Sequence, residues 1–161
     1  SLMDDKRVFT VWEVLSQHGM SMCLQTGAEG LAQVAGLAKR FPKVNIILDH
    51  LARADTSDGP DYKKSVSLFA MANFENVHLK ITPTVFEHAQ KGTATHETFF
   101  PKLVGAFTAQ RIAWGSNFPA TAGKLKDNLA GARKALASLS DDDRAWIFAK
   151  TAQKLYPALR D

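Results

Sequence analysis

The stretch Arg111-Ile-Ala-Trp-Gly-Ser-Asn-Phe-Pro119 joins a short apolar run to a cluster of turn residues. The run from Ile112 to Trp114 is too short for a helix, and Gly-Ser-Asn followed by Pro119 ends it. We therefore predict a buried β-strand whose carboxyl end opens into a loop. In parallel α/β proteins, functional sites are built at this end of a strand, which makes Asn117 a candidate site residue.

Three similar apolar runs precede this stretch and predict three more strands, at residues 20–26, 44–48 and 77–81. Between and after the strands, apolar residues recur at the spacing of one helix face. A helix in every gap argues for parallel strands joined by right-handed crossovers. We thus predict a single α/β domain over residues 1–161. The predicted helices cover residues 8–18, 30–41, 62–74, 97–109, 125–139 and 141–155.

Two architectures fit this alternation of strands and helices. One is a small, open, doubly wound sheet, and the other is half of a (β/α)8 TIM barrel, whose complete form takes about 250 residues. Strand order separates them, because an arc of a barrel keeps its strands adjacent in chain order. No Gly-x-Gly-x-x-Gly follows a strand, and no Gly-Lys-Ser or Gly-Lys-Thr occurs, which argues against nucleotide binding.

The composition is that of an ordinary globular domain, with 45% apolar and 22% charged residues. The net charge of +4 comes from Lys and Arg residues scattered among acids, so we predict no nucleic-acid partner. No apolar run approaches the roughly 20 residues of a membrane helix, so we predict no membrane partner. Cys23 is the single cysteine, which fits a reducing, cytoplasmic location, and its apolar neighbours predict a buried thiol.

Polar side chains at the ends of the predicted strands are the candidate site residues. His50 follows the second strand, where an imidazole can polarise a carbonyl or transfer a proton; the alternative is a His bonded to a neighbouring loop. Lys80 lies in the third strand and, if it points inward, needs an anion or an acid partner; the alternative is a solvated strand end. Asn117 either orients a water or substrate oxygen, or serves as a turn residue before Pro119.

Three motifs in a fixed order carry a resemblance to a known family. They are Asn45-Ile-Ile-Leu-Asp-His-Leu-Ala-Arg53, Asn76-Val-His-Leu-Lys-Ile81 and the stretch at 111–119. Together they resemble the amidohydrolase superfamily of TIM-barrel hydrolases, in the branch that contains pyrone dicarboxylate lactonase and related decarboxylases. The resemblance covers nearly the whole chain and implies the second half of the barrel, with the four strands as its fifth to eighth.

The resemblance implies a hydrolase that acts on a small carboxylated substrate such as a lactone, of the 2-pyrone-4,6-dicarboxylate type. His50 and Asn117 then face the reacting carbonyl as catalytic residues. Gln25, Arg53 and Lys80 then bind anionic groups of the substrate, and Arg53 suits this role through its planar fork, although surface arginines are common. The alternatives are a non-catalytic or truncated half barrel, and a decarboxylase of the same family.

A divalent metal such as zinc is also implied by the resemblance, but its ligands are not evident in this chain. The His-x-His pair of the family's first strand occurs nowhere in the sequence. Gln25 stands where many relatives have a metal-binding His, and Asn117 stands where they have an Asp. An amide cannot neutralise a divalent cation or accept a proton near neutral pH, which argues against metal-dependent hydrolysis by this chain alone.

Four strands cannot close a barrel, so an isolated half would expose two sheet edges and an apolar inner face. We expect one of three solutions to cover them. These are another part of a longer chain, such as the missing N-terminal half; a second copy in a homodimer; or loops of the chain itself.

Overall fold

The structure is a computed structural model that describes residues 5–160. Its centre is a four-stranded sheet in which every neighbouring pair is parallel and the strand order is β1-β2-β3-β4. This order follows the chain, as in an arc of a barrel, and excludes the doubly wound sheet, in which the order is permuted. The predicted fold class, half of a TIM barrel, is confirmed. The strands are β1 (Met22–Leu24), β2 (Ile46–Asp49), β3 (Val77–Ile81) and β4 (Ile112–Trp114).

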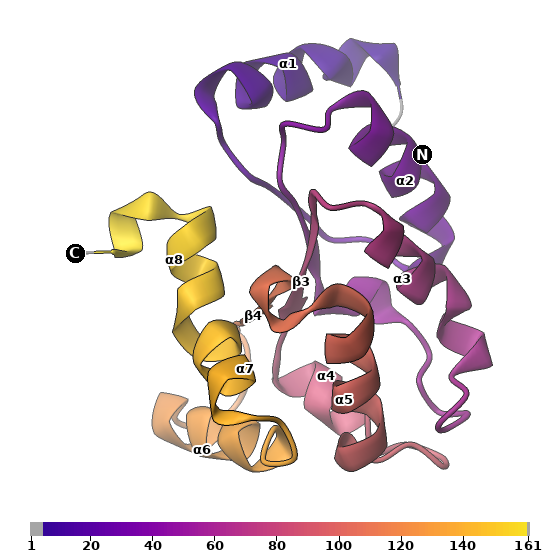
Figure 1. Ribbon diagram of the computed structural model, residues 1–161, viewed down its shortest axis with the longest axis vertical. Helices are drawn as coiled ribbons and strands as arrows, with labels where there is room; N and C mark the ends of the chain where they lie inside the picture. The colour runs from indigo at the N-terminus through magenta and orange to yellow at the C-terminus, as the bar shows by residue number, and fades with distance from the viewer. Residues whose placement is uncertain (1–4, 161) are drawn as a thin grey trace.

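Helices fill the connections between the strands and follow the last of them. In the view of Figure 1, α2, α3 and α5 lie to the right of the strands, and α7 and α8 lie to the left. The helices are α1 (Phe9–His18), α2 (Leu31–Arg40), α3 (Val66–Ala70), α4 (Pro83–His88), α5 (His96–Phe107), α6 (Leu125–Ala135), α7 (Asp141–Ala145) and α8 (Thr151–Leu155).

Three helices differ from the sequence prediction. The helix predicted over 62–74 is reduced to α3 between two 3₁₀ turns, and the last predicted helix is divided by a π-helical turn at Trp146–Lys150. Helix α4 was expected to be a loop. Thr82 is its extended N-cap residue and Pro83 its first residue, a position where the fixed φ of proline favours a helix. The sequence analysis places no helix between residues 81 and 97, because Thr82-Pro83 ends the strand there, whereas the same two residues also begin α4.

One face of the sheet is apolar and covered by helices. Its side chains belong to the same buried cluster as the apolar stripe of α2 and the phenylalanines of α5. Trp12 of α1 extends the cluster by stacking on Phe41, with ring centroids 5.6 Å apart. Burial of a large apolar side chain contributes about 1.5–3 kcal/mol, so this layer holds the strands in register. The strand residues of this face include Ile46, Leu48, Val77, Leu79, Ile81 and Ile112, each at most 1% exposed.

The opposite face carries most of the polar side chains of the strands. Because side chains alternate along a strand, Asp49 and Lys80 point to this side, away from the helix-covered core. In an eight-stranded barrel this is the inner face. The register places Cys23 beside Ile47, Ile47 beside His78, Asp49 beside Lys80, and Lys80 beside Ala113.

The C-terminal segment reaches both faces of the sheet. The ring of Phe148 packs against Trp114 on the helix-covered face, with centroids 5.8 Å apart. The hydroxyl of Tyr156 lies 3.3 Å from the sulfur of Cys23 on the inner face. Part of the inner face is therefore contacted by the chain itself. Within residues 5–160, β1 and β4 each have one strand neighbour, and every helix is too short or too polar to cross a membrane.

Candidate active site

An ion pair joins the carboxyl ends of β2 and β3 on the inner face. The ammonium of Lys80 lies 2.7 Å from Oδ1 of Asp49, and the two side chains are 32% and 17% exposed. The sequence predicted that an inward Lys80 needs an anion or an acid partner, and Asp49 is that partner. The remaining exposure of the ammonium leaves room for a second anionic group to approach it.

The residue that follows β4, Gly115, contacts the aliphatic part of the Lys80 side chain. A Cβ built on Gly115 would lie 3.1 Å from Cδ and 3.3 Å from Cγ of Lys80, closer than ordinary van der Waals contact. The amide of Gly115 also donates a hydrogen bond to the carbonyl of Ile81, at 2.9 Å. Glycine at this position therefore leaves room for the aliphatic stem of Lys80.

His50 is held beside this ion pair by the residue that follows β3. Its Nδ1 lies 2.7 Å from the hydroxyl of Thr82, which is completely buried. Within residues 5–160, Nε2 of the ring has no hydrogen-bond partner. The contact with Thr82 matches the alternative of a His bonded to a neighbouring loop, but it also orients the ring and leaves one nitrogen for a ligand.

The backbone between His50 and Arg53 is strained. Four consecutive residues without a glycine have positive φ values of 51° to 53°, namely His50, Leu51, Ala52 and Arg53. The left-handed conformation costs about 1–2 kcal/mol per non-glycine residue and is normally visited by single residues. Strain of this kind persists where the surrounding structure holds it, and it often marks functional segments. The turn leaves His50 at the rim and Arg53 exposed.

The other predicted site residues lie at the same edge of the sheet but make different contacts. Asn117 is exposed, has a φ of 52°, and donates a hydrogen bond from Nδ2 to the hydroxyl of Thr121 at 3.1 Å. Thr121 in turn donates its backbone N–H to the Asn117 carbonyl, so Asn117 closes a turn. Gln25 is exposed just past β1. Arg53 lines a separate small pocket with His88.

Two ionisable groups below the rim have perturbed pKa values. Burial lowers the pKa of His78 to about 4, so the imidazole is neutral at pH 7. Burial also raises the pKa of Tyr156, and the contact with Cys23 and the charge of Asp49 add to this effect. The prediction of a buried Cys23 was wrong, because β1 is an edge strand and its inner-face thiol is exposed beside the tyrosine.

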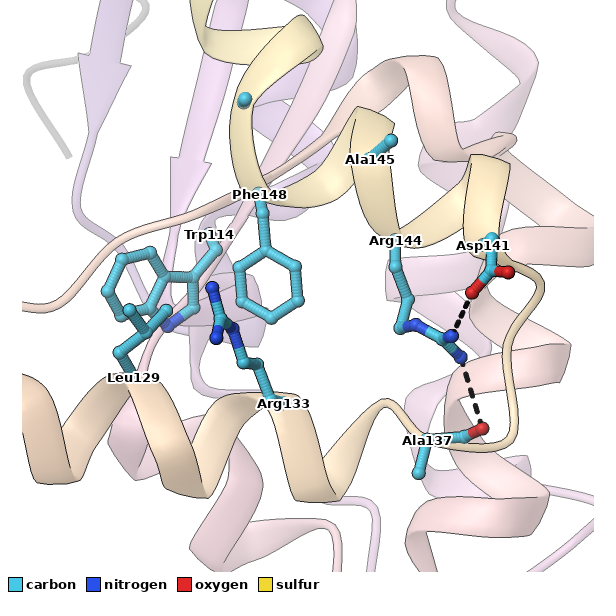
Figure 2. Close-up of a pocket in the computed structure, with 9 residues that line it drawn as sticks. Trp114, Leu129, Arg133, Ala137, Asp141, Arg144, Ala145 and Phe148 are labelled. Atoms are coloured by element: carbon cyan, nitrogen blue, oxygen red, sulfur yellow. Dashed lines mark hydrogen bonds and ion pairs between the residues drawn. The ribbon is translucent and has the colours of Figure 1, made fainter.

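A larger groove lies apart from the rim, on the helix-covered side of β4. Figure 2 shows Trp114, Leu129, Arg133 and Phe148 gathered in it, between α6 and the helices that follow. Its volume is about 770 Å³. Since Trp114 and Lys80 point to opposite faces of the sheet, this groove does not belong to the candidate site.

Comparison with known sequences decides the family. The family model described as Amidohydrolase matches residues 3–158. The chain belongs to the amidohydrolase family. The resemblance drawn from the three sequence motifs is thereby confirmed.

Relatives of this chain include a lactonase. L-fucono-1,5-lactonase of Burkholderia ambifaria is 24% identical over 118 residues, which are 73% of this chain and 41% of the lactonase. An amidohydrolase structure from Burkholderia multivorans with bound zinc matches with a TM-score of 0.73 and 17% identity, over 98% of this chain and 63% of that one.

A third relative is a Pseudomonas putida protein whose proposed activity is hydrolysis of 2-pyrone-4,6-dicarboxylic acid. It matches with a TM-score of 0.78 and 17% identity, over 100% of this chain and 60% of that one. At this identity the solved structures establish the fold alone. The amidohydrolase chain thus spans between about two fifths and two thirds of the length of these relatives.

The rim residues of this chain do not by themselves fit a zinc ion. A catalytic zinc takes three protein ligands, usually His, Cys, Asp or Glu. No three such side chains come together anywhere in the part of the chain from residue 5 to 160. At the rim, the Lys80 ammonium already compensates Asp49 and repels a cation, while Gln25 and Asn117 offer amides.

The sequence analysis did not predict three residues of the candidate site. They are Asp49, Thr82 and Tyr156. Asp49 could have been found, because it lies two residues after the inward-facing Ile47 and directly opposite Lys80 in a parallel pairing. Thr82 lies two residues after Lys80, although nothing in its type indicated a bond to His50. Tyr156 is 133 residues from Cys23 in the chain, and no local pattern predicts their contact.

Proposed function

We propose that the chain is the site-bearing half of a hydrolase that opens small carboxylated lactones, of the sugar-lactone or 2-pyrone-4,6-dicarboxylate type. The observation that carries the proposal is the rim of β2 and β3. There, His50, whose ring is oriented by Thr82, directly follows Asp49 in the chain, and Asp49 is paired with the partly exposed side chain of Lys80. The family and the lactonase relative support the reaction class.

His50 and Lys80 have different roles in the proposed reaction. His50 polarises the lactone carbonyl through Nε2, since its Nδ1 is occupied by Thr82. Lys80 binds the substrate carboxylate through the part of its ammonium that Asp49 does not cover. Water gives a proton to the Asp49 carboxylate as its oxygen adds to the carbonyl carbon. The ring C–O bond then breaks, and the released alkoxide takes that proton to give a hydroxy acid.

The remaining predicted roles complete the proposal. Asp49 is the rim carboxylate that can accept a proton from the attacking water, a role that the amide of Asn117 cannot fill. Asn117 shapes the β4 loop and orients a substrate oxygen, while Gln25 and Arg53 contact the anionic groups of the substrate. We further propose a cytoplasmic location, on the basis of the single cysteine.

The free edges of β1 and β4 need a partner for a barrel to close. We propose that either the N-terminal half of a longer chain or a second copy provides it, because an unpaired parallel edge is exposed to aggregation. Gel filtration with light scattering tests the second alternative. A monomer that binds no apolar dye would contradict the homodimer.

Turnover tests the function directly. The chain is assayed against a panel of sugar-1,5-lactones and carboxylated pyrones, with production of acid followed at constant pH. We expect at least one substrate to be opened by the wild type and His50→Ala to lose a factor of about 10²–10⁴, the usual contribution of acid–base groups. His18→Ala, on the exposed end of α1, is the matched control. Equal rates for wild type and His50→Ala would leave the non-catalytic half barrel as the better interpretation.

A further inference from the structure

The groove on the helix-covered side of β4 has the size of a ligand site and lies outside the candidate active site. Its volume of about 770 Å³ is within the range of about 300–1,000 Å³ that is typical of small-molecule sites. The proposed hydrolysis does not use it, because Trp114 and Lys80 point to opposite faces of the sheet. The apolar residues of its lining are Trp114, Leu129, Ala137, Ala145, Phe148 and Ala149.

The two aromatic residues of the lining pack against each other. The ring centroids of Trp114 and Phe148 are 5.8 Å apart, and the ring planes are inclined by 57°. Both side chains are only partly buried, so each presents ring surface to the groove (Figure 2). A further ring can pack on this pair edge-to-face or in an offset stack, the two arrangements that aromatic groups favour.

The indole nitrogen of Trp114 is a hydrogen-bond donor without an acceptor. Its Nε1 is buried, and within residues 5–160 it has no hydrogen-bond partner. A buried N–H is normally paired, because leaving it without an acceptor costs free energy. An oxygen atom of a bound molecule can supply the missing acceptor.

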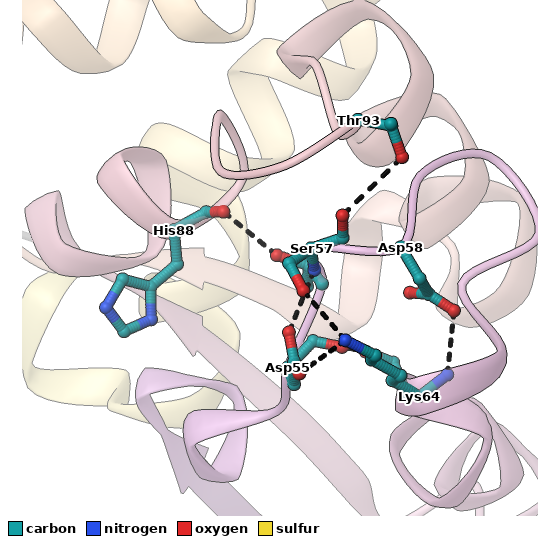
Figure 3. A network of polar contacts seen from close by, with 8 residues as sticks. Asp55, Ser57, Asp58, Lys64, His88 and Thr93 are labelled. Carbon is teal, nitrogen blue, oxygen red and sulfur yellow. Dashed lines mark hydrogen bonds and ion pairs between the residues drawn. The ribbon is translucent and has the colours of Figure 1, made fainter.

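Arg133 adds a positive charge to the groove. Figure 2 shows its side chain extending from α6 toward the rings of Trp114 and Phe148. Within residues 5–160, this side chain forms no hydrogen bond or ion pair with the protein. In the polar network after β2, by contrast, the ammonium of Lys64 lies 3.4 Å from Oδ2 of Asp55 (Figure 3). The guanidinium of Arg133 is therefore free to pair with an anion.

The other charges of the groove are already compensated. Arg144 pairs with Asp141 through Nη2, and it donates a hydrogen bond from Nη1 to the carbonyl of Ala137 at 3.2 Å (Figure 2). Since Arg144 holds the carboxylate of Asp141, this acid does not neutralise Arg133. Among the described lining residues, Arg133 is thus the unpaired cation beside an aromatic surface.

We propose that this groove binds a small aromatic carboxylate, with its ring against Trp114 and Phe148 and its carboxylate on Arg133. The planar fork of the guanidinium pairs with both carboxylate oxygens. One of these oxygens also serves as the acceptor for the indole N–H. The site does not depend on the proposed lactone hydrolysis, because the groove and the rim lie on opposite faces of the sheet and binding is measured without turnover.

Titration of the full chain with benzoate tests the proposal. Benzamide is the neutral analogue of the same shape, and acetate is the acid without a ring. The indole ¹H–¹⁵N NMR signals of Trp114 and Trp12 are followed at constant ionic strength, since Trp12 is buried in the core against Phe41. We expect benzoate to shift the Trp114 signal saturably and to leave the Trp12 signal in place. Benzamide and acetate should each bind about tenfold more weakly, because one lacks the charge and the other lacks the ring.

Arg133→Met tests the charge, and Lys134→Met is the matched control. Both residues are exposed on α6, but Lys134 does not line the groove. Each variant removes one positive charge and keeps an apolar stem. We expect benzoate to bind about tenfold more weakly to Arg133→Met and with unchanged affinity to Lys134→Met. The comparison of the three ligands uses the wild type, so a variant that fails to fold leaves that test intact.

Four results would overturn the proposal. Benzoate would fail to shift the Trp114 signal saturably, or it would shift only the signals of the rim around His50. Benzamide would bind as tightly as benzoate, which would make the groove a general apolar surface. Finally, Lys134→Met would weaken binding as much as Arg133→Met, which would reduce the effect of Arg133 to net charge.

Discussion

The ammonium of Lys80 lies 2.7 Å from Oδ1 of Asp49, and this contact links the carboxyl ends of two neighbouring parallel strands. Both side chains are partly buried on the inner face, where neither would be stable without the other. The pair therefore has two effects. It fixes the end of the β2–β3 ladder, and it places a cation at the rim that also carries His50.

Breaking this pair should destabilise the fold through the charge left behind. We expect Lys80→Met to lower the free energy of unfolding by roughly 2 kcal/mol, because the Asp49 carboxylate loses its partner while partly buried. The double variant Asp49→Asn/Lys80→Met should recover most of that loss. Lys63→Met, which breaks an exposed pair with Asp61, should change stability by less than about 0.5 kcal/mol. Chemical denaturation of the wild type and the three variants measures these changes. Equal losses for Lys80→Met and Lys63→Met would show that the rim pair stabilises the fold no more than an exposed pair does.

Gly115 should be intolerant of a methyl group. Alanine there places Cβ 3.1 Å from Cδ of Lys80, so the lysine stem must shift and its ion pair with Asp49 is disturbed. We expect a lower melting temperature for Gly115→Ala. At Gly131, on the exposed side of α6, an added Cβ meets nothing within 4 Å, and alanine should stabilise the helix by about 0.5–1 kcal/mol. A stabilising effect at both positions would count against the close approach of Gly115 and Lys80.

The strained turn after β2 reverses the usual preference between alanine and glycine. At position 53, where φ is 52°, glycine should be more stable than alanine by about 1 kcal/mol. At the exposed position 130 of α6, alanine should be the more stable by a similar amount. Thermal unfolding of Arg53→Gly, Arg53→Ala and Ala130→Gly provides the comparison. If alanine were preferred at both positions, the left-handed turn would not exist in solution.

His78 should make stability depend on pH below neutrality. Its pKa is lowered from 6.5 to about 4 in the folded chain, so between these values the unfolded chain binds a proton that the folded chain does not. Stability is therefore complete above pH 6.5, falls as the pH drops toward about 4, and loses up to about 3 kcal/mol from this group. Denaturation at a series of pH values should show a smaller slope in His78→Leu. The slope should persist in His18→Leu, whose histidine is exposed on α1.

The fold could be predicted because its signals are local and repeated. The four apolar runs recur with a helix in each gap, and strands such as Val77–Ile81 match the predicted bounds. The prediction of helices and of buried residues failed where one sequence pattern is compatible with two structures. Thr82-Pro83 ends a strand and also begins a helix, and the apolar neighbours of Cys23 do not reveal that its own side chain is on the exposed face of an edge strand.

The candidate site was only partly predictable. Position at the end of a strand was enough to find His50 and Lys80, since parallel strands bring their carboxyl ends together. The partners that hold them depend on register and on distant contacts, as Thr82 and Tyr156 show. The separation of Arg53 from His50 depends on four left-handed residues, a conformation that nothing in their side-chain types predicts.

The central claim is that a lactone-derived hydroxy acid binds at His50, on the carboxyl ends of β2 and β3. Its most direct test is the ¹⁵N NMR spectrum of the histidine rings while a sugar-derived hydroxy acid is added to the full chain. We predict that the His50 ring signals shift saturably, that those of His18 stay in place, and that Lys80→Met weakens the response. A His50 signal that does not move while other histidines respond would contradict the account.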